Sequence, residues 1–489
     1  MNVLRYLHPN LKRYASICCA VGCLALLSAC EIAPSAPTAA QPTPSAQPTL
    51  TPQPVPSALA AQAGRVGACE QLTGAGPAAA TGTQAQPVAS DTASAAVVHF
   101  DDKTNTILLR AGAQTTLTGI SQVVNRPEVL EQLAPGEWLL SANLRIEAGA
   151  SLRIAAPETR WLKLRSGDHG FVWLKALGGQ LEFRGTCVSS WDAERQQYDE
   201  NYQDGRAFVL ARAGARMDIH ASDLRYLGYD GSEAFGLAWR LKGTSGQIVD
   251  SFISYNFYGL YSYQVDDLVI RGNQAHHNVM YGIDPHSQSM RLVIENNVVH
   301  DNGKHGIILA EECSNGIIRN NVSYNNLHHG IVIYQRSNDN LVEGNAAYGN
   351  GGHGININDS ANTIVRGNTV YDNLEAGIGI GQQASATQLL GNTVRANRGD
   401  GVTLYSDVKG SLLRENTISD NARYGIYVKS AGDLRVEGNQ VVGNAVGVYL
   451  NTAAPPEISR TTNRIEGNHE ADLRQGSEQA QVASEGDQP

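Results

Sequence analysis

A glycine followed by an aliphatic residue returns at an almost constant interval through the second half of the chain. The interval is 22 to 24 residues, and the glycines are Gly236, Gly259, Gly282, Gly306, Gly330, Gly354, Gly377, Gly401, Gly425 and Gly447. Internal repeats of this length are typical of solenoids, in which each unit stacks on its neighbours and buries its apolar side chains against them. The repeat therefore predicts a solenoid.

The composition of each repeat indicates which solenoid is formed. Short runs rich in Val and Ile, such as "LVIENNVV", "HGIILA" and "HGIVIY", alternate with Asn and Gly. The L-x-x-L-x-L framework of leucine-rich repeats does not occur. Short β-type runs bounded by turn residues predict an all-β fold, a parallel β-helix with about three strands in each coil of 22–24 residues.

If each repeat forms one coil, residues at equivalent positions of successive repeats line up in columns along the helix, and two such columns can be predicted. Asparagines whose side-chain amides can hydrogen-bond from coil to coil are expected at Asn273, Asn297, Asn321, Asn345, Asn368, Asn392, Asn416 and Asn439. Side chains one position after each repeat glycine are expected to point inward, namely Leu237, Leu260, Ile283, Ile307, Ile331, Ile355, Ile378, Val402, Ile426 and Val448. The second column predicts the core.

The remaining sequence sets the domain boundaries. Alternating runs without strict period predict less regular coils upstream of the repeats, so the β-helix is expected over residues 96–455, with a capping strand or helix near residues 97–130. Residues 30–95 are rich in Pro, Ala, Thr, Gln and Ser, which predicts a disordered tether. Residues 456–489 lack apolar periodicity and are expected to be a flexible tail.

The N-terminus has the features of an export signal. Arg5, Lys12 and Arg13 precede an apolar run that is too short to span a bilayer and ends in "LSAC". This ending resembles the lipobox of bacterial lipoproteins, which implies a signal peptide over residues 1–29 and lipidation of Cys30; an ordinary signal peptide cut near Ala29 is the alternative. By the same resemblance Glu31 favours the outer membrane.

The cysteines limit the disulfides that can form, and the net charge limits the class of binding partner. Beyond the signal and Cys30, the chain keeps Cys69, Cys187 and Cys313, so at most one disulfide can form within it; Cys69–Cys187 is the favoured pair, although no spacing requires it. The formal net charge of −10 argues against nucleic acid as a partner, and attraction of a polyanion would have to be local.

Polar and aromatic residues gather on one outer face of the predicted helix. Strand alternation and the position before each glycine place there Tyr258, Tyr261, Tyr263, Tyr281, Asp284, His286, Lys304, His305, His328, His329 and Tyr334. Adjacent coils lie about 4.8 Å apart, so these residues nearly touch. A long shallow groove with aromatic rings suits a polymer with sugar rings.

The stretch "YGIDPHSQS", at residues 281–289, and its surroundings resemble the bacterial alginate (mannuronan) C5-epimerases, most closely the periplasmic kind with a right-handed parallel β-helix. The resemblance covers roughly residues 220–450. It implies that His286 is the base or its partner, that Tyr281 transfers a proton on the other ring face, and that Asp284 orients or polarises the pair. The calcium-binding nonapeptides of the secreted kind do not occur.

Two positions depart from the pattern of that family. The periplasmic kind has Asp where Ser287 follows His286, and Arg where "ILAEE" has Glu311. A carboxylate beside an anionic substrate would repel it. Lys304, Arg291 or Arg336 are the candidates for the missing positive charge, and Arg336 is counted with the expected substrate-binding residues.

The sequence thus predicts a periplasmic, lipid-anchored enzyme that converts mannuronate to guluronate residues in an alginate-like polymer. No cofactor or metal is expected, calcium dependence stays open, and a polysaccharide secretion complex is the expected assembly. A polysaccharide lyase, a non-catalytic polysaccharide-binding β-helix, and a metal-handling helix built on His305, His329 and His353 are the alternatives.

Overall fold

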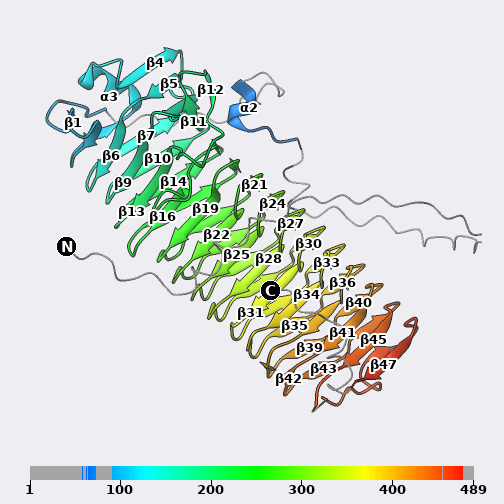
Figure 1. Cartoon of the computed structure of the whole chain (residues 1–489). Coiled ribbons are helices and arrows are strands. Elements are labelled where there is room, and N and C mark those ends of the chain that lie inside the picture. Colours follow the sequence, from blue (N-terminus) through cyan, green and yellow to red (C-terminus); the bar gives the residue numbers. More distant parts are fainter. Residues whose placement is uncertain (1–57, 59–61, 63, 73–90, 454, 477–489) are drawn as a thin grey trace, which may run out of the picture. The chain divides into compact units, whose positions relative to one another are not determined.

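In the computed structural model the chain winds repeatedly through three long β-sheets and so forms a parallel β-helix (Figure 1). The structure describes residues 58, 62, 64–72, 91–453 and 455–476, all of which belong to the unit Pro54–Pro489. The predicted signal peptide over residues 1–29 and Cys30 lie outside the described residues. The all-β prediction is confirmed, since successive strands of each coil join three different sheets.

The strands of each sheet follow one another along the helix. Sheet 1 contains β1 (Val98–Asp101), β2 (Thr106–Leu109), β6 (Asn143–Glu147), β9 (Trp173–Leu177), β13 (Phe208–Arg212), β16 (Gly236–Arg240), β19 (Tyr258–Tyr263), β22 (Ile283–His286), β25 (Ile307–Ala310), β28 (Ile331–Tyr334), β31 (Ile355–Asn358), β34 (Ile378–Gly381), β37 (Val402–Leu404), β41 (Tyr424–Val428), β45 (Val446–Leu450) and β47 (Ala471–Gln475). Sheet 2 contains β3 (Gln114–Thr115), β7 (Ser151–Ala155), β10 (Gln180–Arg184), β14 (Arg216–His220), β17 (Ser245–Val249), β20 (Val269–Arg271), β23 (Val293–Glu295), β26 (Ile317–Arg319), β29 (Leu341–Glu343), β32 (Ile364–Arg366), β35 (Gln388–Leu390), β39 (Leu412–Arg414) and β43 (Arg435–Glu437).

Sheet 3 contains β4 (Leu130–Ala134), β5 (Glu137–Leu140), β8 (Trp161–Arg165), β11 (Cys187–Asp192), β15 (Asp223–Arg225), β18 (Phe252–Ser254), β21 (Gln274–His276), β24 (Val298–His300), β27 (Val322–Tyr324), β30 (Ala346–Tyr348), β33 (Thr369–Tyr371), β36 (Thr393–Arg395), β40 (Thr417–Ser419), β44 (Gln440–Val442) and β46 (Arg464–Ile465), with β12 (Gln197–Tyr198) paired to β11. A short pair, β38 (Val408–Lys409) and β42 (Ala431–Gly432), joins two turns.

The core forms where the glycine-anchored column was predicted. Each of the ten side chains one position after a repeat glycine, from Leu237 to Val448, is fully buried. A Cβ on Gly306 would lie 2.7 Å from the carbonyl oxygen of Gly330, so the close approach of neighbouring coils requires glycine at this bend. The register of the whole helix follows from these two constraints.

Two asparagine ladders bind the coils together. The ladder predicted from Asn273 to Asn439 forms and continues to Asn463, and each amide nitrogen donates to the amide oxygen of the next coil over 2.9–3.0 Å. A second ladder, from Asn278 to Asn468 and over 2.8–3.1 Å, was not predicted, although it keeps the same interval five residues further on.

Replacement of Asn321 by alanine is expected to destabilise the helix by about 2–5 kcal/mol, because buried partners lose their hydrogen bonds. Asn321 Nδ2 donates to Ile294 O and to Asn345 Oδ1, and its Oδ1 accepts from the backbone and side chain of Asn297. The neighbouring Asn320→Gly variant is the control, since Asn320 is exposed and has a positive φ that glycine tolerates. Thermal unfolding followed by circular dichroism measures both; equal melting temperatures would show that the ladder contributes little.

The N-terminal end of the solenoid is capped as predicted. Helix α3 (Leu117–Val124) lies beside the antiparallel pair β1–β2, and the Thr116 hydroxyl accepts a hydrogen bond from Gly119 N at its N-terminus. Leu117 and Ile120 of this helix are fully buried in the core. The cap thus covers the apolar end of the first coil.

The prediction of disorder over residues 30–95 is wrong for residues 64–72. Helix α2 (Ala68–Leu72) packs on β11, and Cys69 forms a disulfide with Cys187, which confirms the favoured cysteine pair. Arg65 donates to Gly272 O, and Gln62 donates to Asn273 O and Asn296 O. The partners in this disulfide and in these hydrogen bonds belong to coils far along the sequence, so the local composition of residues 30–95 could not predict the contacts. No helix among the described residues is long and apolar enough to cross a membrane.

The predicted boundary at residue 455 is also too early. β46 pairs with β44 and β47 pairs with β45, so the solenoid continues to Gln475. Ile465 is buried and Asn463 and Asn468 complete the two ladders. Apolar residues are sparse here because the last coil needs only one buried face.

Candidate active site

A cavity of about 240 Å³ opens on the outer face of sheet 1, over strands β22, β25, β28 and β31. Its lining consists of Tyr281, Asp284, His286, His305, Ile308, Ala310, Glu311, His329, Val332, Tyr334, Asn356 and Asn358. The structure therefore brings together all three residues predicted as catalytic and three of those predicted to bind substrate. We treat this cavity as the candidate active site.

Strand β22, which carries Asp284 and His286, contains a proline, a residue that is rare in the interior strands of a sheet. Pro285 lies in a strand with neighbours on both sides, although proline has no N–H to donate to a sheet. Cα partners between β22 and β25 are recorded at Ile283↔Ile307 and His286↔Ala310, with an interruption between them. Such local irregularities concentrate at functional sites.

Asp284 is buried rather than exposed on the outer face, and in this respect the prediction was wrong. Its side chain has no exposed surface, and neither carboxyl oxygen has a hydrogen-bond partner among the described residues. Burial raises the pKa of Asp284 well above its usual range, and the nearby Glu311 carboxylate raises that pKa further. The raised pKa favours the protonated form of the Asp284 carboxyl group, which is a hydrogen-bond donor at the cavity.

His286 lies at the end of β22 and makes contacts on two sides. Its ring stacks on Tyr261, with centroids 5.7 Å apart. Its Nδ1 lies 2.8 Å from Ser287 Oγ, and Ser287 Oγ donates to Glu311 Oε2 over 2.6 Å. Burial lowers the pKa of His286, and Glu311 opposes that shift. The imidazole is therefore neutral near pH 7 and can act as a base.

Tyr281 precedes strand β22 and lies on the other side of Asp284 from His286 along the chain. Its ring stacks on His305 with centroids 5.3 Å apart and contacts Tyr258 at 5.4 Å. The Lys304 ammonium lies 5.6 Å from the centre of the same ring. Burial, together with Asp284, raises the pKa of Tyr281 to about 12, so its phenol keeps its proton and can donate it.

Aromatic residues extend the site upstream along sheet 1. Tyr261 packs with Phe235 and Tyr258, and Tyr263 lies on the next position of the same strand face. Sequence reasoning missed Arg240, whose guanidinium lies 4.9 Å from the centre of the Tyr263 ring. Its Nε is buried without a hydrogen-bond partner in the described part of the chain. The repeat could have indicated Arg240, because Arg240 pairs with Tyr263 and Tyr263 pairs with His286 on successive strands of sheet 1.

Three stacked histidines extend the site downstream. The rings of His305, His329 and His353 lie parallel, with centroids 4.9–5.0 Å apart. Nδ1 of each ring accepts a backbone N–H from the next coil, of His329, His353 and Ala376 respectively. Each neutral ring must then carry its proton on Nε2. Burial lowers the pKa of His305 to about 3 and that of His329 to about 2, so the stack consists of uncharged N–H donors.

This stack does not form a chelate. Among the described residues, no three His, Cys, Asp or Glu side chains are grouped so that they could hold a metal ion. Parallel rings whose Nδ1 atoms already accept backbone hydrogen bonds cannot converge on one ion. The geometry therefore gives no support to the metal-handling alternative.

Several predicted substrate-binding residues lie outside the cavity. His328 is exposed and meets His305 edge-on at 5.6 Å. Arg336 pairs with Glu312 over 2.8 Å, and Arg291 pairs with Asp267 over 2.8 Å. Neither arginine supplies a free cation to the site. Among the candidates named from the sequence, Lys304 is left beside the cavity.

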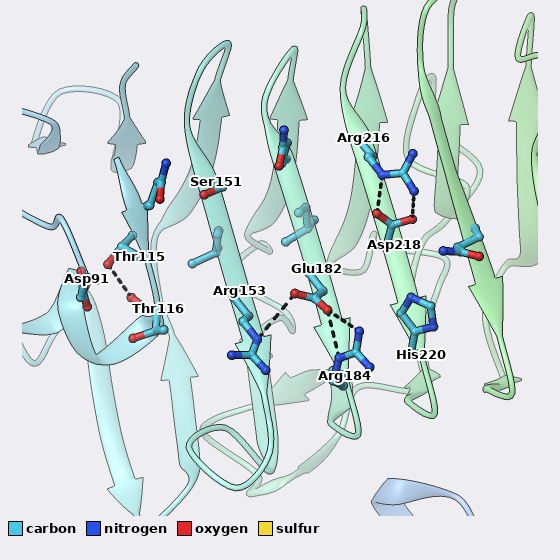
Figure 2. Close-up of a pocket in the computed structure, with 15 residues that line it drawn as sticks. Asp91, Thr115, Thr116, Ser151, Arg153, Glu182, Arg184, Arg216, Asp218 and His220 are labelled. Carbon is cyan, nitrogen blue, oxygen red and sulfur yellow. Dashed lines mark hydrogen bonds and ion pairs between the residues drawn. The ribbon is translucent and has the colours of Figure 1, made fainter. Parts of the chain in front are cut away.

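A larger cavity, of about 470 Å³, lies on the outer face of sheet 2 near the N-terminal cap. Figure 2 shows that its charged side chains point toward one another, with Arg184 on Glu182 and Arg216 on Asp218. The ion pairs span 2.8 Å and 2.6 Å. The cavity lining contains no Tyr, Trp or Phe. The arginines at these two positions are thus paired with carboxylates of the same cavity.

The fold and the site together define a parallel β-helix protein with acid and base groups in a surface groove. The chain belongs to the family described as right handed beta helix region, whose model matches residues 236–394 and 350–484. The family confirms the predicted right-handed parallel β-helix.

Relatives with known names narrow the class. The mannuronan C5-epimerase of Pseudomonas aeruginosa is 30% identical over 176 residues, which cover 33% of this chain and 32% of that protein. Mannuronan C5-epimerase AlgG of Azotobacter vinelandii is 32% identical over 175 residues, with the same shares of 33% and 32%. The matched stretch thus spans about a third of the length of these curated relatives.

Solved structures extend the likeness. A double mutant of the periplasmic alginate epimerase AlgG aligns with 68% of this chain and 84% of its own, at 25% identity and a TM-score of 0.63. A second AlgG crystal structure has 22% identity and a TM-score of 0.57, which supports the fold alone. The resemblance to alginate C5-epimerases that the Tyr281–His286 segment indicates is confirmed.

Proposed function

We propose that this protein is a polyuronate C5-epimerase that converts D-mannuronate to L-guluronate residues within an alginate-like polymer. The convergence of Tyr281, Asp284 and His286 on one cavity carries the proposal, since it supplies a base, a proton donor and a neutral acid around a single sugar. The named relatives and AlgG structures support the same reaction.

The reaction begins at an unreactive C–H bond. The C5 proton of a uronate is weakly acidic because it lies next to a carboxylate, and removal of the proton places further negative charge on that group. The site must therefore stabilise the carboxylate more strongly as charge develops. A carboxylic acid that its apolar surroundings keep neutral can do this by donating a hydrogen bond, as an aspartic acid does in ketosteroid isomerase. Asp284 is buried, and its raised pKa favours the protonated form, so it fits that role.

Inversion at C5 then needs one group on each face of the sugar. His286 removes the proton, and Tyr281 delivers a proton from the other side. The two residues flank Asp284 along the chain, and in this proposal the uronate binds with its carboxylate at Asp284 and one of the two residues on each face of its ring. At neutral pH both are in the required state, since the pKa of His286 is lowered and that of Tyr281 is raised to about 12.

Neighbouring sugars of the polymer occupy the rest of the groove in this proposal. Upstream rings of Tyr258, Tyr261 and Tyr263 offer stacking surfaces, and Arg240 and Lys304 attract the polymer's carboxylates. Downstream, His305, His329 and Tyr334 offer contacts without adding charge. His328 and Arg336, which the sequence had placed with them, have no role in the proposal. Local cations of this kind reconcile a formal net charge of −10 with an anionic substrate.

We expect a bell-shaped pH profile. The base form of His286 is lost as pH falls through its pKa, so the acid limb should lie below the ordinary value of 6.5. The neutral form of Asp284 is lost as pH rises through its raised pKa, which gives the alkaline limb. The Asp284→Asn variant keeps a hydrogen-bond donor that cannot ionise, so it should lose the alkaline limb and keep the acid limb. Initial rates of guluronate formation between about pH 4 and 9 measure both limbs; an unchanged alkaline limb in this variant would refute the role of Asp284.

Incubation of polymannuronate with the protein, with and without EDTA, tests the proposed activity. New guluronate signals in the proton NMR spectrum support epimerisation, and their persistence in EDTA supports catalysis without calcium or another cofactor. Unsaturated chain ends would instead identify a lyase. An unchanged spectrum together with measurable polymer binding would identify a non-catalytic module.

The proposal extends to location. The basic and apolar N-terminal sequence, the "LSAC" motif and the periplasmic AlgG neighbours support a periplasmic enzyme that is lipid-anchored at Cys30, with the outer membrane favoured. An enzyme that modifies an exported polymer is best placed beside the secretion machinery of that polymer, which would be its partner.

A further inference from the structure

We infer that Glu311 and Ser287 form a positioning relay that holds a proton on Nδ1 of His286 and leaves Nε2 as the base. The inference concerns the proposed epimerase site and rests on that proposal for its effect on the rate. It assigns a use to the two positions at which this chain departs from the family pattern.

Hydrogen-bond accounting sets the direction of the relay. Ser287 has one hydroxyl proton, and it donates that proton to Glu311 Oε2 over 2.6 Å. The contact of 2.8 Å between Ser287 Oγ and His286 Nδ1 must then have the imidazole as donor. Nδ1 therefore carries the proton of the neutral ring. No described residue forms a hydrogen bond with Nε2, so its lone pair is free to accept a proton from the sugar.

The backbone holds these groups in place. His286 and Ala310 are partners in the β22–β25 pair, so Ser287 and Glu311 follow them one coil apart in the same turn. Both have a positive φ, of 27° and 58°, and Gln288 N donates to Glu311 O over 2.8 Å. The backbone carbonyl of His286 accepts from Ser289 Oγ over 3.0 Å. The relay is therefore built into the stacking of two coils.

The contact also explains why a carboxylate is tolerated beside an anionic substrate. Oε2 of Glu311 faces Ser287 and lies 3.6 Å from His286 Nδ1, so its charge acts on the imidazole. A carboxylate behind a histidine stabilises the imidazolium that forms when the base takes a proton. Removal of that charge weakens the base without removing it.

The relay can be broken without unfolding the protein. The Glu311 side chain is 44% exposed, and exposed hydrogen-bonded pairs contribute little to stability. Glu312, the next residue, offers a matched control, because it pairs with Arg336 and Gln288 on the outside of the same turn. Neither Glu312 nor its partners lines the cavity.

The test compares Glu311→Gln, Ser287→Ala and their double variant with Glu312→Gln. We expect kcat to fall about 10- to 100-fold in both single variants, with KM changed less than about 2-fold, as for other residues that orient a functional imidazole. The double variant should lose no more than the worse single one, because both break one relay. In Glu311→Gln the acid limb of the pH profile should move to lower pH, since the imidazole loses a neighbouring negative charge. Glu312→Gln should match the wild type.

Nitrogen-15 NMR of the His286 ring gives a readout that needs no substrate. The wild type should show the Nδ1–H tautomer, and the Ser287→Ala and Glu311→Gln variants should show a mixture. An unchanged tautomer, or a Glu311→Gln enzyme with full kcat and an unmoved acid limb, would overturn the relay. If no polyuronate is epimerised yet the tautomer depends on Glu311, the proposed function fails while the relay stands.

Discussion

Replacement of His286 by asparagine is expected to lower the rate of epimerisation by about 10²- to 10⁴-fold, the usual contribution of a positioned general base. Asparagine retains a polar group of smaller size but cannot accept the C5 proton. Rates of guluronate formation measure the effect, and binding of polymannuronate to the variant should change little, since the groove surfaces on other coils remain.

His300→Asn is the matched control for this variant. His300 also lies at the end of a strand and stacks between two rings, those of His276 and Tyr324, but it belongs to sheet 3. Its replacement should leave the rate unchanged. Equal losses in both variants would mean that damage to the solenoid, rather than loss of the base, explains the result. A His286→Asn enzyme with more than about a tenth of the wild-type rate would contradict the assignment.

Replacement of Tyr281 by phenylalanine should also cost about 10²- to 10⁴-fold in rate, because only the hydroxyl that delivers the proton is lost. The ring keeps its stacking on His305 and its contact with Tyr258, so KM should stay near the wild-type value. Steady-state kinetics of guluronate formation separate kcat from KM.

Tyr324→Phe provides the comparison. Tyr324 stacks in a similar way on His300 and Tyr348, but on sheet 3 and away from the cavity. It should retain full activity. If Tyr281→Phe raises KM and leaves kcat unchanged, Tyr281 is a binding residue and the proton donor must be sought elsewhere.

The fold could be predicted from the sequence because its determinants repeat. Leu260, Ile283 and Ile307 each follow a glycine at the same interval, and a strand period of two sends all of them inward. The folded segment near Cys69 lies outside the repeat and is held by contacts with other coils, so its placement needed the structure. The last coil near Ile465 lacks the glycine–aliphatic pair, although Asn463 and Asn468 keep the asparagine interval.

The site could be predicted only in part. The Tyr281, Asp284 and His286 cluster follows from strand alternation and the family resemblance, but the burial of Asp284 does not. The phenols of Tyr258 and Tyr261, from a different coil, are themselves buried, which raises their pKa values, and both lie close enough to Asp284 to interact with its carboxyl group. Enclosure of this kind depends on side-chain packing between coils, which no spacing along the chain reveals.

The relay of Glu311 and Ser287 was within reach of the sequence. The two residues are 24 positions apart, which is one coil, so the repeat itself places them side by side. Glu311 taken alone suggested repulsion of the substrate. Taken with its neighbour in the preceding coil, the same residue is a hydrogen-bond acceptor behind the base. In solenoids, a departure from a family pattern should therefore be examined together with the residue one coil away.

The isotope content of the product tests the central claim, that two different groups act on opposite faces of C5, most directly. Polymannuronate is incubated with the protein in D₂O, and the reaction is stopped while most mannuronate residues of the polymer are still unconverted. Deuterium at C5 is then measured by NMR. The two-group mechanism predicts that every new guluronate carries deuterium from the solvent-exchanged Tyr281 hydroxyl, while the remaining mannuronate stays unlabelled. Guluronate that retains its original proton would contradict the mechanism, since one group would then have moved that proton from face to face.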